Sequence, residues 1–169
     1  EKTPDDAALK TEFLSSADQL VKANADTAYA FHSLLLQARA AMDRADYPAA
    51  VQALQKAINQ KVDDPGLIQL AQLRLARVQV QQAQPDAALA TLAKVTDAAF
   101  IPSAQELKGD ILFQKNQLEP AKAAYQAAWD ALTKREEPRE LLRVKMQAIG
   151  MTAAEIEVAS PLVDAGAGS

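Results

Sequence analysis

The side chain best suited to acid–base chemistry is the chain's single histidine, His32. A histidine can act as a general base near neutral pH, but it needs an orienting group and a substrate pocket. No serine or aspartate is placed convincingly beside His32, so we interpret it as a partly exposed residue of a helix or groove. The chain has no cysteine, which excludes disulfides, thiolate metal sites and cysteine nucleophiles. With one histidine, multi-histidine metal sites are excluded as well.

Three pairs of adjacent carboxylates are the next candidates for chemistry: Asp5–Asp6, Asp63–Asp64 and Glu136–Glu137. Neighbouring residues on a helix do not share a face, so such pairs make poor acid–base dyads there. Each pair stands where a helix is expected to begin, and the helix dipole favours negative charge at that end. The sequence also lacks a glycine-rich phosphate loop and a DxDxDG calcium loop. We therefore expect no enzyme, no cofactor and no metal.

The composition indicates which elements would have to position a site. Of the 169 residues, 37 are alanine, whereas only 5 are glycine, 4 Phe, 3 Tyr and 1 Trp. Alanine favours helices and lets helix axes approach closely, so we expect a core of packed helices. The net charge of -4 disfavours a nucleic-acid binder. No run of about 18 uncharged apolar residues is present, so no segment is expected to span a membrane. Because the chain begins with Glu1, we expect an upstream segment to have been removed.

An internal repeat organises the chain. Three small residues, Ala38, Ala76 and Gly109, are each followed by an alanine twelve positions later. A large apolar residue follows at the sixteenth position and a small or β-branched residue at the nineteenth. The three sets are Ala50, Leu54 and Ala57; Ala88, Leu92 and Val95; and Ala121, Tyr125 and Ala128. Their alanines at the twelfth position are 38 and 33 residues apart, and these spacings bracket the period of about 34 residues of tetratricopeptide helix pairs.

The repeat predicts an all-α fold, a tetratricopeptide-like α-solenoid of about three helix hairpins with an extra N-terminal and a C-terminal helix, over residues 1–150. The small residues let the two helices of each pair cross closely. Pro48, Pro85 and Pro120 fall in the first turn of each second helix, where a missing N–H is tolerated. The apolar spacing predicts helices over residues 6–23, 27–44, 47–60, 66–83, 85–96, 102–116, 118–134 and 138–149. The first of these is expected to place on one face Leu9, Phe13 and Leu20.

In tetratricopeptide arrays the first helix of each pair lines a concave face, which predicts a partner-binding groove. Counting back from the small residues gives the equivalent positions. They are His32, Leu35, Arg39 and Met42; Leu70, Leu73, Arg77 and Val80; and Ser103, Glu106, Asp110 and Phe113. The helix over residues 66–83 is apolar on two sides, which predicts burial on both. Two explanations stay open: the lead or last helix covers the groove, or an apolar strip flanked by Arg39 and Arg77 binds a partner segment.

Two further features concern the C-terminal third. Tyr125 and Trp129 lie four residues apart, and we favour core packing for both over an interface role for Trp129. Residues 151–169 lose the helical periodicity, and all their charges are acidic. They are expected to form a poorly ordered acidic, small-residue tail, with a short helix over residues 152–158 as the alternative.

The residues also resemble a known family. The stretch Leu73–Leu89, which reads LRLARVQVQQAQPDAAL, looks like the core of YfgM-like proteins. Further similar segments are Ala28–Ala30, Glu106–Leu112, Ala121–Tyr125 and Leu141–Met146. The resemblance covers residues 27–149 at the level of pattern. The family's membrane-spanning helix is missing from this sequence, and the residues after Gly150 have no recognised counterpart.

The resemblance implies a role in protein export. YfgM-like proteins are ancillary subunits of the bacterial Sec translocon, with one N-terminal membrane-spanning helix and a periplasmic tetratricopeptide-like domain. They associate with a membrane-anchored, PpiD-type chaperone and are thought to hand secreted chains to periplasmic chaperones. By this resemblance the chain is expected to be the periplasmic domain of a single-pass inner-membrane protein and a non-enzymatic protein-interaction module. The alternative is a generic tetratricopeptide scaffold of another envelope or secretion assembly.

Overall fold

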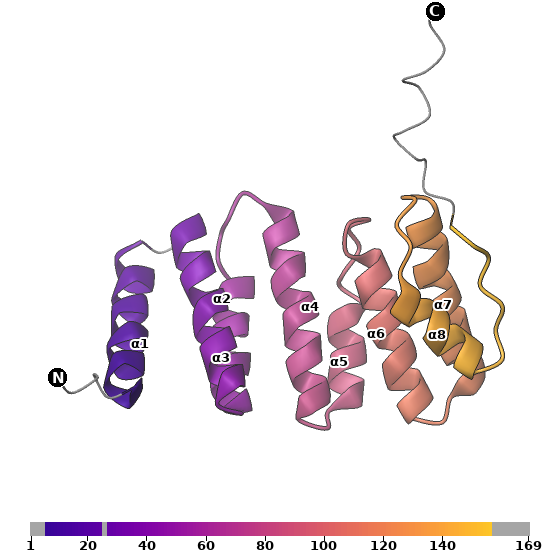
Figure 1. The fold of residues 1–169 in the computed structure, drawn as a ribbon. Coiled ribbons are helices and arrows are strands. Elements are labelled where there is room, and N and C mark those ends of the chain that lie inside the picture. The colour runs from indigo at the N-terminus through magenta and orange to yellow at the C-terminus, as the bar shows by residue number, and fades with distance from the viewer. Residues whose placement is uncertain (1–5, 25–26, 157–169) are drawn as a thin grey trace, which may run out of the picture. The chain divides into compact units, whose positions relative to one another are not determined.

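A computed structural model describes residues 6–24 and 27–156 of the chain. Within these ranges the chain forms eight α-helices and no strand, which confirms the all-α prediction (Figure 1). The helices are α1 (Asp6–Ala23), α2 (Ala28–Asp43), α3 (Tyr47–Ile58), α4 (Pro65–Gln81), α5 (Pro85–Leu92), α6 (Ile101–Gln114), α7 (Leu118–Thr133) and α8 (Glu140–Ala148). Every predicted helix is present. The largest difference in length is at α5, which ends at Leu92 instead of residue 96.

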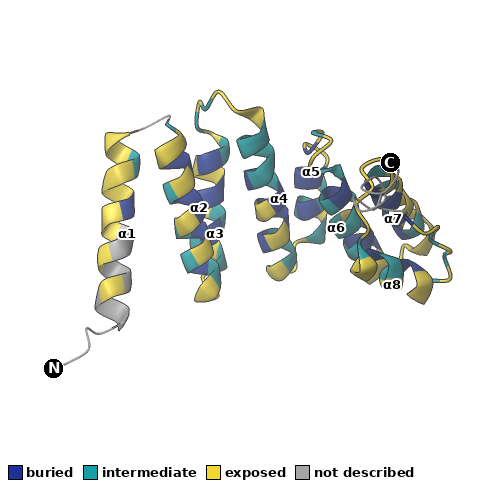
Figure 2. Cartoon of the chain, turned by 45° about the horizontal axis from the view of Figure 1, so that its top comes forward, coloured by how far each residue is buried: buried dark blue, intermediate teal, exposed yellow. Residues whose placement is uncertain are grey.

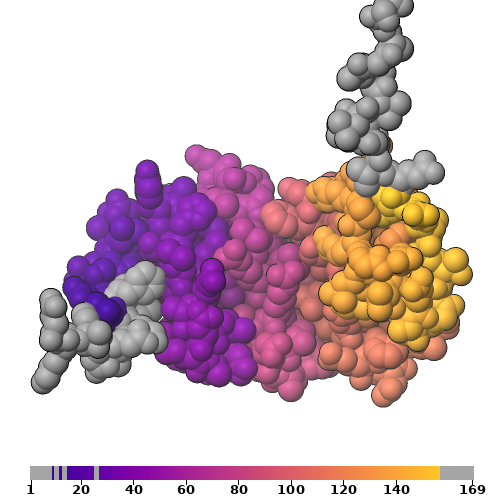
Figure 3. Space-filling model, viewed as in Figure 1, coloured from indigo at the N-terminus to yellow at the C-terminus, as the bar shows by residue number. Residues whose placement is uncertain are grey.

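The helices belong to two compact units. The first unit, Glu1–Phe100, contains α1 to α5, and the second, Ile101–Ser169, contains α6 to α8. Within each unit the side chains fill the spaces between neighbouring helices (Figure 3). In the described ranges, no helix is both long and apolar enough to cross a membrane.

The first unit is built from small residues where helices meet. Helix α1 packs on α2, α2 on α3, α3 on α4, and α4 on α5. Buried residues lie on each of α2, α3, α4 and α5 (Figure 2). The alanines that the repeat predicted at the crossings, Ala38 with Ala50 and Ala76 with Ala88, are all buried. Larger apolar side chains fill the space beside them, and the largest fully buried ones here are Phe31, Leu34 and Leu54. Small residues at the crossing therefore let paired helices approach, as predicted.

The third pair, α6 with α7, uses glycine at the crossing. Gly109 is buried, and a Cβ atom added to it would overlap the ring of Tyr125 on α7. Helix α8 packs on α7 and adds Leu142 and Met146 to a core cluster that includes Tyr125 and Trp129. Both aromatic residues are almost fully buried, which confirms core packing for each.

The turn inside each pair repeats at the level of the backbone. Ala45, Ala83 and Asn116 have positive φ angles of 56°, 55° and 58°, and each lies seven residues after the small crossing residue. The residue after each of them donates its N–H across the helix end, to the carbonyls of Ala41, Gln79 and Leu112, at 2.9 Å in all three cases. This hydrogen bond and the left-handed residue form a Schellman-type helix end, in which glycine is usual. The three pairs thus share one turn geometry.

A helix start explains one residue of the central acidic pair, Asp64. The side chain of Asp64 accepts hydrogen bonds from the backbone N–H groups of Gly66, at 2.8 Å, and Leu67, and so caps α4. Asp46 caps α3 in the same way, by accepting from Ala49 at 3.1 Å. These caps satisfy donors that the first helical turn leaves free, so no catalytic role is needed for the carboxylates. Proline occupies one of the first three positions in five described helices, at Pro48, Pro65, Pro85, Pro102 and Pro120.

Two features differ from the simplest expectation. On α1, Leu9 and Leu20 are 50% and 40% exposed, whereas Ala17 is buried and Val21 packs against the core. The predicted apolar face of α1 is therefore not the packed one, because α2 meets the neighbouring face. The side chain of Phe13 lies outside what the structure describes.

The start of the predicted tail is held against the second unit. Residues 151–156 contain no helix, and Ile156 is buried in the cluster of α7 and α8, beside the partly buried Met151 and Ala153. A hydrophobic anchor thus follows α8 without helical periodicity, which is why helical spacing did not reveal it. Residues 157–169 lie outside the described residues.

Candidate functional site

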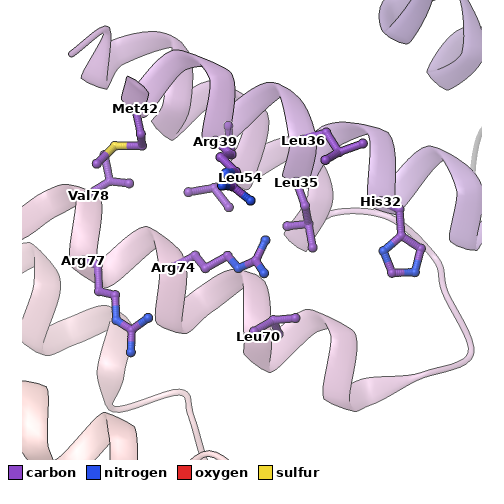
Figure 4. Close-up of a pocket in the computed structure, with 11 residues that line it drawn as sticks. His32, Leu35, Leu36, Arg39, Met42, Leu54, Leu70, Arg74, Arg77 and Val78 are labelled. Atoms are coloured by element: carbon purple, nitrogen blue, oxygen red, sulfur yellow. The ribbon is translucent and has the colours of Figure 1, made fainter. Parts of the chain in front are cut away.

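The first unit carries an apolar groove between α2 and α4, with Leu54 of α3 behind it (Figure 4). Its volume is about 530 Å³, which is within the range of small ligand or side-chain pockets. We call it the α2–α4 groove. The residues that line it are His32, Leu35, Leu36, Ala38, Arg39, Met42, Leu54, Leu70, Arg74, Arg77 and Val78.

Helical spacing brings these side chains together. On α2 the lining residues recur every three or four positions from His32 to Met42, so they share one face. On α4 the same spacing runs from Leu70 through Arg74 to Val78. Phe31 and Leu34, on the adjoining face of α2, are fully buried, and this fixes which side of the helix faces the groove.

The groove combines an apolar surface with positive charge. Arg39 of α2 and Arg74 of α4 extend toward each other across it, while Arg77 projects away from α2 (Figure 4). All three arginines are exposed, and none forms an ion pair within the described residues. Leucine, methionine and valine side chains provide the rest of the wall. Such a surface can bind apolar side chains and carboxylates together.

The groove does not have the composition of a catalytic site. Its lining, as far as the chain is described, contains one histidine but no carboxylate, serine, threonine or tyrosine. His32 is exposed, and its nearest aromatic contact is edge-to-face with Phe31, with ring centroids 6.0 Å apart. A general base without an orienting group or a nucleophile has little to act on. The described residues also hold no cluster of three metal-ligating side chains.

The structure brings most of the predicted groove residues of the first two pairs together. His32, Leu35, Arg39, Met42, Leu70 and Arg77 line the α2–α4 groove. Leu73 is 4% exposed and belongs to the interior, and Val80 is half-buried outside the groove. The sequence reasoning missed Leu36 and Arg74, which also line it. Leu36 lies four residues after His32, and Arg74 lies four residues after Leu70. This spacing by one helical turn could have indicated that both residues share the groove face.

The predicted residues of the third pair lie in the second unit, where α8 and its N-cap residue, Arg139, engage Ser103, Glu106 and Asp110. Arg139 donates to Glu106 at 2.9 Å, and Lys145 donates to Glu106 and to Asp110, both at 2.8 Å. Tyr125 donates its hydroxyl to the other oxygen of Asp110, also at 2.8 Å. Phe113 remains 49% exposed on α6.

This ionic network has clear electrostatic consequences. Burial raises the pKa of Glu106, but hydrogen bonds and positive charge from Lys145 and Arg139 outweigh it and lower that pKa below its ordinary value. Burial lowers the pKa of Lys145, and its bonds to Asp110 and Glu106 reverse this, so that its pKa is raised. Burial and the adjacent Asp110 carboxylate both raise the pKa of Tyr125.

The last helix covers predicted groove residues in the second unit, whereas partner binding in the first unit stays a prediction. In the second unit the last helix, α8, is tied to Glu106 and Asp110 of α6 by ion pairs. In the first unit no residue of α1, where its side chains are described, lines the α2–α4 groove. The groove of the first unit is therefore the stronger candidate for binding a partner.

Comparison with known proteins places the chain in a family. A family model described as a tetratricopeptide repeat-like domain matches residues 3–151. The chain is 40% identical over 111 residues to a protein of Aggregatibacter actinomycetemcomitans, covering 66% of this chain and 54% of that protein. It is 37% identical over 114 residues to one of Haemophilus influenzae, covering 68% and 55%, and 32% identical over 118 residues to one of Escherichia coli, covering 70% and 56%.

Each of these relatives is named an ancillary SecYEG translocon subunit. The chain spans about half the length of the curated relatives it matches. No solved structure matches it. The shared name confirms the resemblance to YfgM-like proteins that the sequence showed. The chain belongs to the tetratricopeptide repeat-like domain family, and its curated relatives are ancillary subunits of the SecYEG translocon.

Proposed function

We propose that this chain is a non-enzymatic protein-binding module of an accessory subunit of the Sec translocon, and that it docks a partner segment in the α2–α4 groove. The observation that carries the proposal is the groove itself, which combines apolar side chains of two helices with three arginines. The family and the names of the relatives support the translocon as the assembly in which it acts.

The energy of docking would come from surface that is still exposed. Leu36 is 51% exposed on the wall of the groove, and Leu70 and Met42 are half-buried. Covering such side chains gains about 25 cal/mol for each Å² of apolar surface removed from water. The arginines would add orientation through charge-assisted hydrogen bonds. A partner that covers Leu36 is therefore expected to lose much of its affinity when that residue becomes charged.

The test is co-purification of SecYEG with the complete protein from bacterial cells. Leu36→Asp should reduce the recovered SecYEG by at least about tenfold, because it removes an apolar contact and places a charge where the partner must exclude water. The control is Leu141→Asp, which changes another exposed leucine, 62% exposed on α8. Circular dichroism should show unchanged helicity in both variants. Equal recovery with the two variants would refute the groove as the docking site.

A finer proposal follows from the resemblance to YfgM-like proteins. The domain would lie in the periplasm and connect translocated chains to a membrane-anchored, PpiD-type chaperone. Protease added to cells with a permeabilised outer membrane should then cleave the domain, and Leu36→Asp should also weaken co-purification of the chaperone. A protected domain would contradict the periplasmic placement. If wild-type preparations contain another envelope assembly and no SecYEG, the translocon proposal is refuted and the alternative, a generic scaffold of that assembly, is supported.

A further inference from the structure

Equivalent positions in the repeats carry opposite charges. The residue that directly follows the small crossing residue is Arg39 in the first pair, Arg77 in the second and Asp110 in the third. Arg39 and Arg77 line the α2–α4 groove, whereas Asp110 belongs to the network between α6 and α8. The same geometric position is thus positive in one unit and negative in the other.

The second unit shows how such a position is used. The carboxylates of Glu106 and Asp110 on α6 pair with Lys145 of α8, and Glu106 also pairs with Arg139, the residue before α8, at 2.8 to 2.9 Å. The Glu106 side chain is only 12% exposed, so its charge is largely removed from water and needs these partners. Beside the ion pairs, Leu142 and Met146 of α8 are fully buried at a spacing of four residues. An amphipathic helix of complementary charge therefore completes this face.

The first unit has the opposite arrangement. Across its groove, α2 and α4 present like charges, Arg39 against Arg74 and Arg77, so no ion pair can join the two helices there. The three guanidinium groups have no carboxylate partner among the residues that the structure describes. The groove between them stays open and apolar. In the second unit, α8 supplies positive charge to the carboxylates of α6. In the first unit, no described helix supplies the negative charge that the arginines would need.

From this reversal we propose that the partner segment docked in the α2–α4 groove is an acidic amphipathic helix. Its apolar side chains, spaced by three or four residues, would pack on Leu36, Met42 and Leu70. Its carboxylates would pair with Arg39 and Arg74, as arginine forks prefer. Helix-in-groove recognition uses this combination of spaced apolar anchors and flanking charge. The inference rests on the proposed function, since it specifies the chemistry of the same docking site.

Two synthetic peptides of about 15 residues, long enough to form a helix, test the inference. Both are alanine-based and carry the same leucine stripe, but one has glutamate and the other lysine beside it. Fluorescence anisotropy with the full chain should show that the glutamate peptide binds at least about tenfold more tightly. Its affinity should fall as salt is raised. The double variant Arg39→Glu with Arg74→Glu should reverse the preference.

A matched control separates local pairing from net charge. Arg44→Glu with Lys56→Glu changes the charge of the first unit equally, at side chains that line a different hollow. This control should keep the preference for the glutamate peptide. Equal binding of the two peptides, binding of neither, or equal weakening by both double variants would overturn the inference.

The remaining outcomes separate the inference from the proposed function. If shortening the chain after Ile156 raises the affinity for the glutamate peptide, the chain's own acidic segment occupies the groove and an external partner is refuted. If Leu36→Asp abolishes co-purification of SecYEG but the arginine reversal does not, the proposed function stands and the acidic helix is refuted. If Leu36→Asp has no effect on co-purification, the proposed function itself fails, whatever the peptides show.

Discussion

Replacing Gly109 by alanine tests the packing rule on which the fold depends. Alanine is favoured over glycine within a helix by about 1 kcal/mol, so propensity alone predicts stabilisation. The new Cβ, however, would overlap the ring of Tyr125 on the partner helix. Forcing an extra methyl group into a packed core costs about 1–3 kcal/mol. If the ring moves, the 2.8 Å hydrogen bond from Tyr125 to Asp110 is weakened as well, at a further cost of about 1.5 kcal/mol.

The net expectation is that Gly109→Ala lowers the free energy of unfolding by about 1–3 kcal/mol, and Tm by about 2–4 °C for each kcal/mol. Urea denaturation and thermal melting followed by circular dichroism measure both quantities. The structure also predicts a reversal of sign. When Gly109→Ala is combined with Tyr125→Leu, the third pair has alanine at the crossing and leucine beside it, as the first pair has with Ala38 and Leu54. Gly109→Ala should then be neutral or stabilising by up to about 1 kcal/mol.

The two backgrounds together make the test specific. If Gly109→Ala is neutral or stabilising in the wild-type chain, the close approach of α6 and α7 at Gly109 is refuted. If it destabilises equally in both backgrounds, the cost does not arise from contact with Tyr125, and the explanation of why this pair needs glycine is wrong.

Three further predictions follow from the turns, the segment after α8 and the ionic network. Ala83→Gly should raise the free energy of unfolding by about 1 kcal/mol, because a φ of 55° strains an alanine. The control Ala90→Gly, at an exposed helical site, should lower the free energy of unfolding by about 1 kcal/mol. Equal effects of the two substitutions in urea denaturation would contradict the left-handed turn. Ile156→Ala should lower the free energy of unfolding, measured in urea, by about 2 kcal/mol or more, because Ile156 is buried. Its neighbour Glu155→Ala should lower it by less than about 0.5 kcal/mol. Similar values for the two would show that Ile156 is not anchored. Because the pKa of Glu106 is lowered on folding, its contribution to stability is present above its unfolded pKa and is lost as pH falls through the lower folded value. Glu106→Gln should therefore lower the free energy of unfolding at pH 7, and the variant should lose less stability than the wild type as pH falls below about 4.5. An unchanged dependence of stability on pH would contradict the network.

The sequence was sufficient for the helices and their pairing, because short-range spacing determines both. The recurrence of Ala38, Ala76 and Gly109 twelve residues before an alanine reflects one crossing geometry, and the structure places all of these residues in the interior. Proline in the first turns marked where the second helices begin. Such signals are local and repeat three times, so they survive differences in individual residues.

The details of the site could not be predicted because they depend on how helices rotate against one another. Spacing by three or by four residues from Leu70 leads to Leu73 or to Arg74, and only packing shows that Leu73 is buried while Arg74 lines the groove. The pairing of Glu106 with Lys145 joins residues 39 positions apart, for which no periodic signal exists. Ile156 follows the last helix without any repeat, so its burial is visible only in three dimensions.

Site-specific photocrosslinking in cells tests the central claim, that the α2–α4 groove holds a protein partner, most directly. A photoreactive residue replaces Leu36, on the groove, or Leu141, an exposed leucine on α8, in the complete protein. We predict a discrete protein adduct from position 36 that disappears in the Arg39→Glu, Arg74→Glu background, and none of comparable yield from position 141. No adduct from position 36, or equal adducts from both positions, would contradict the account.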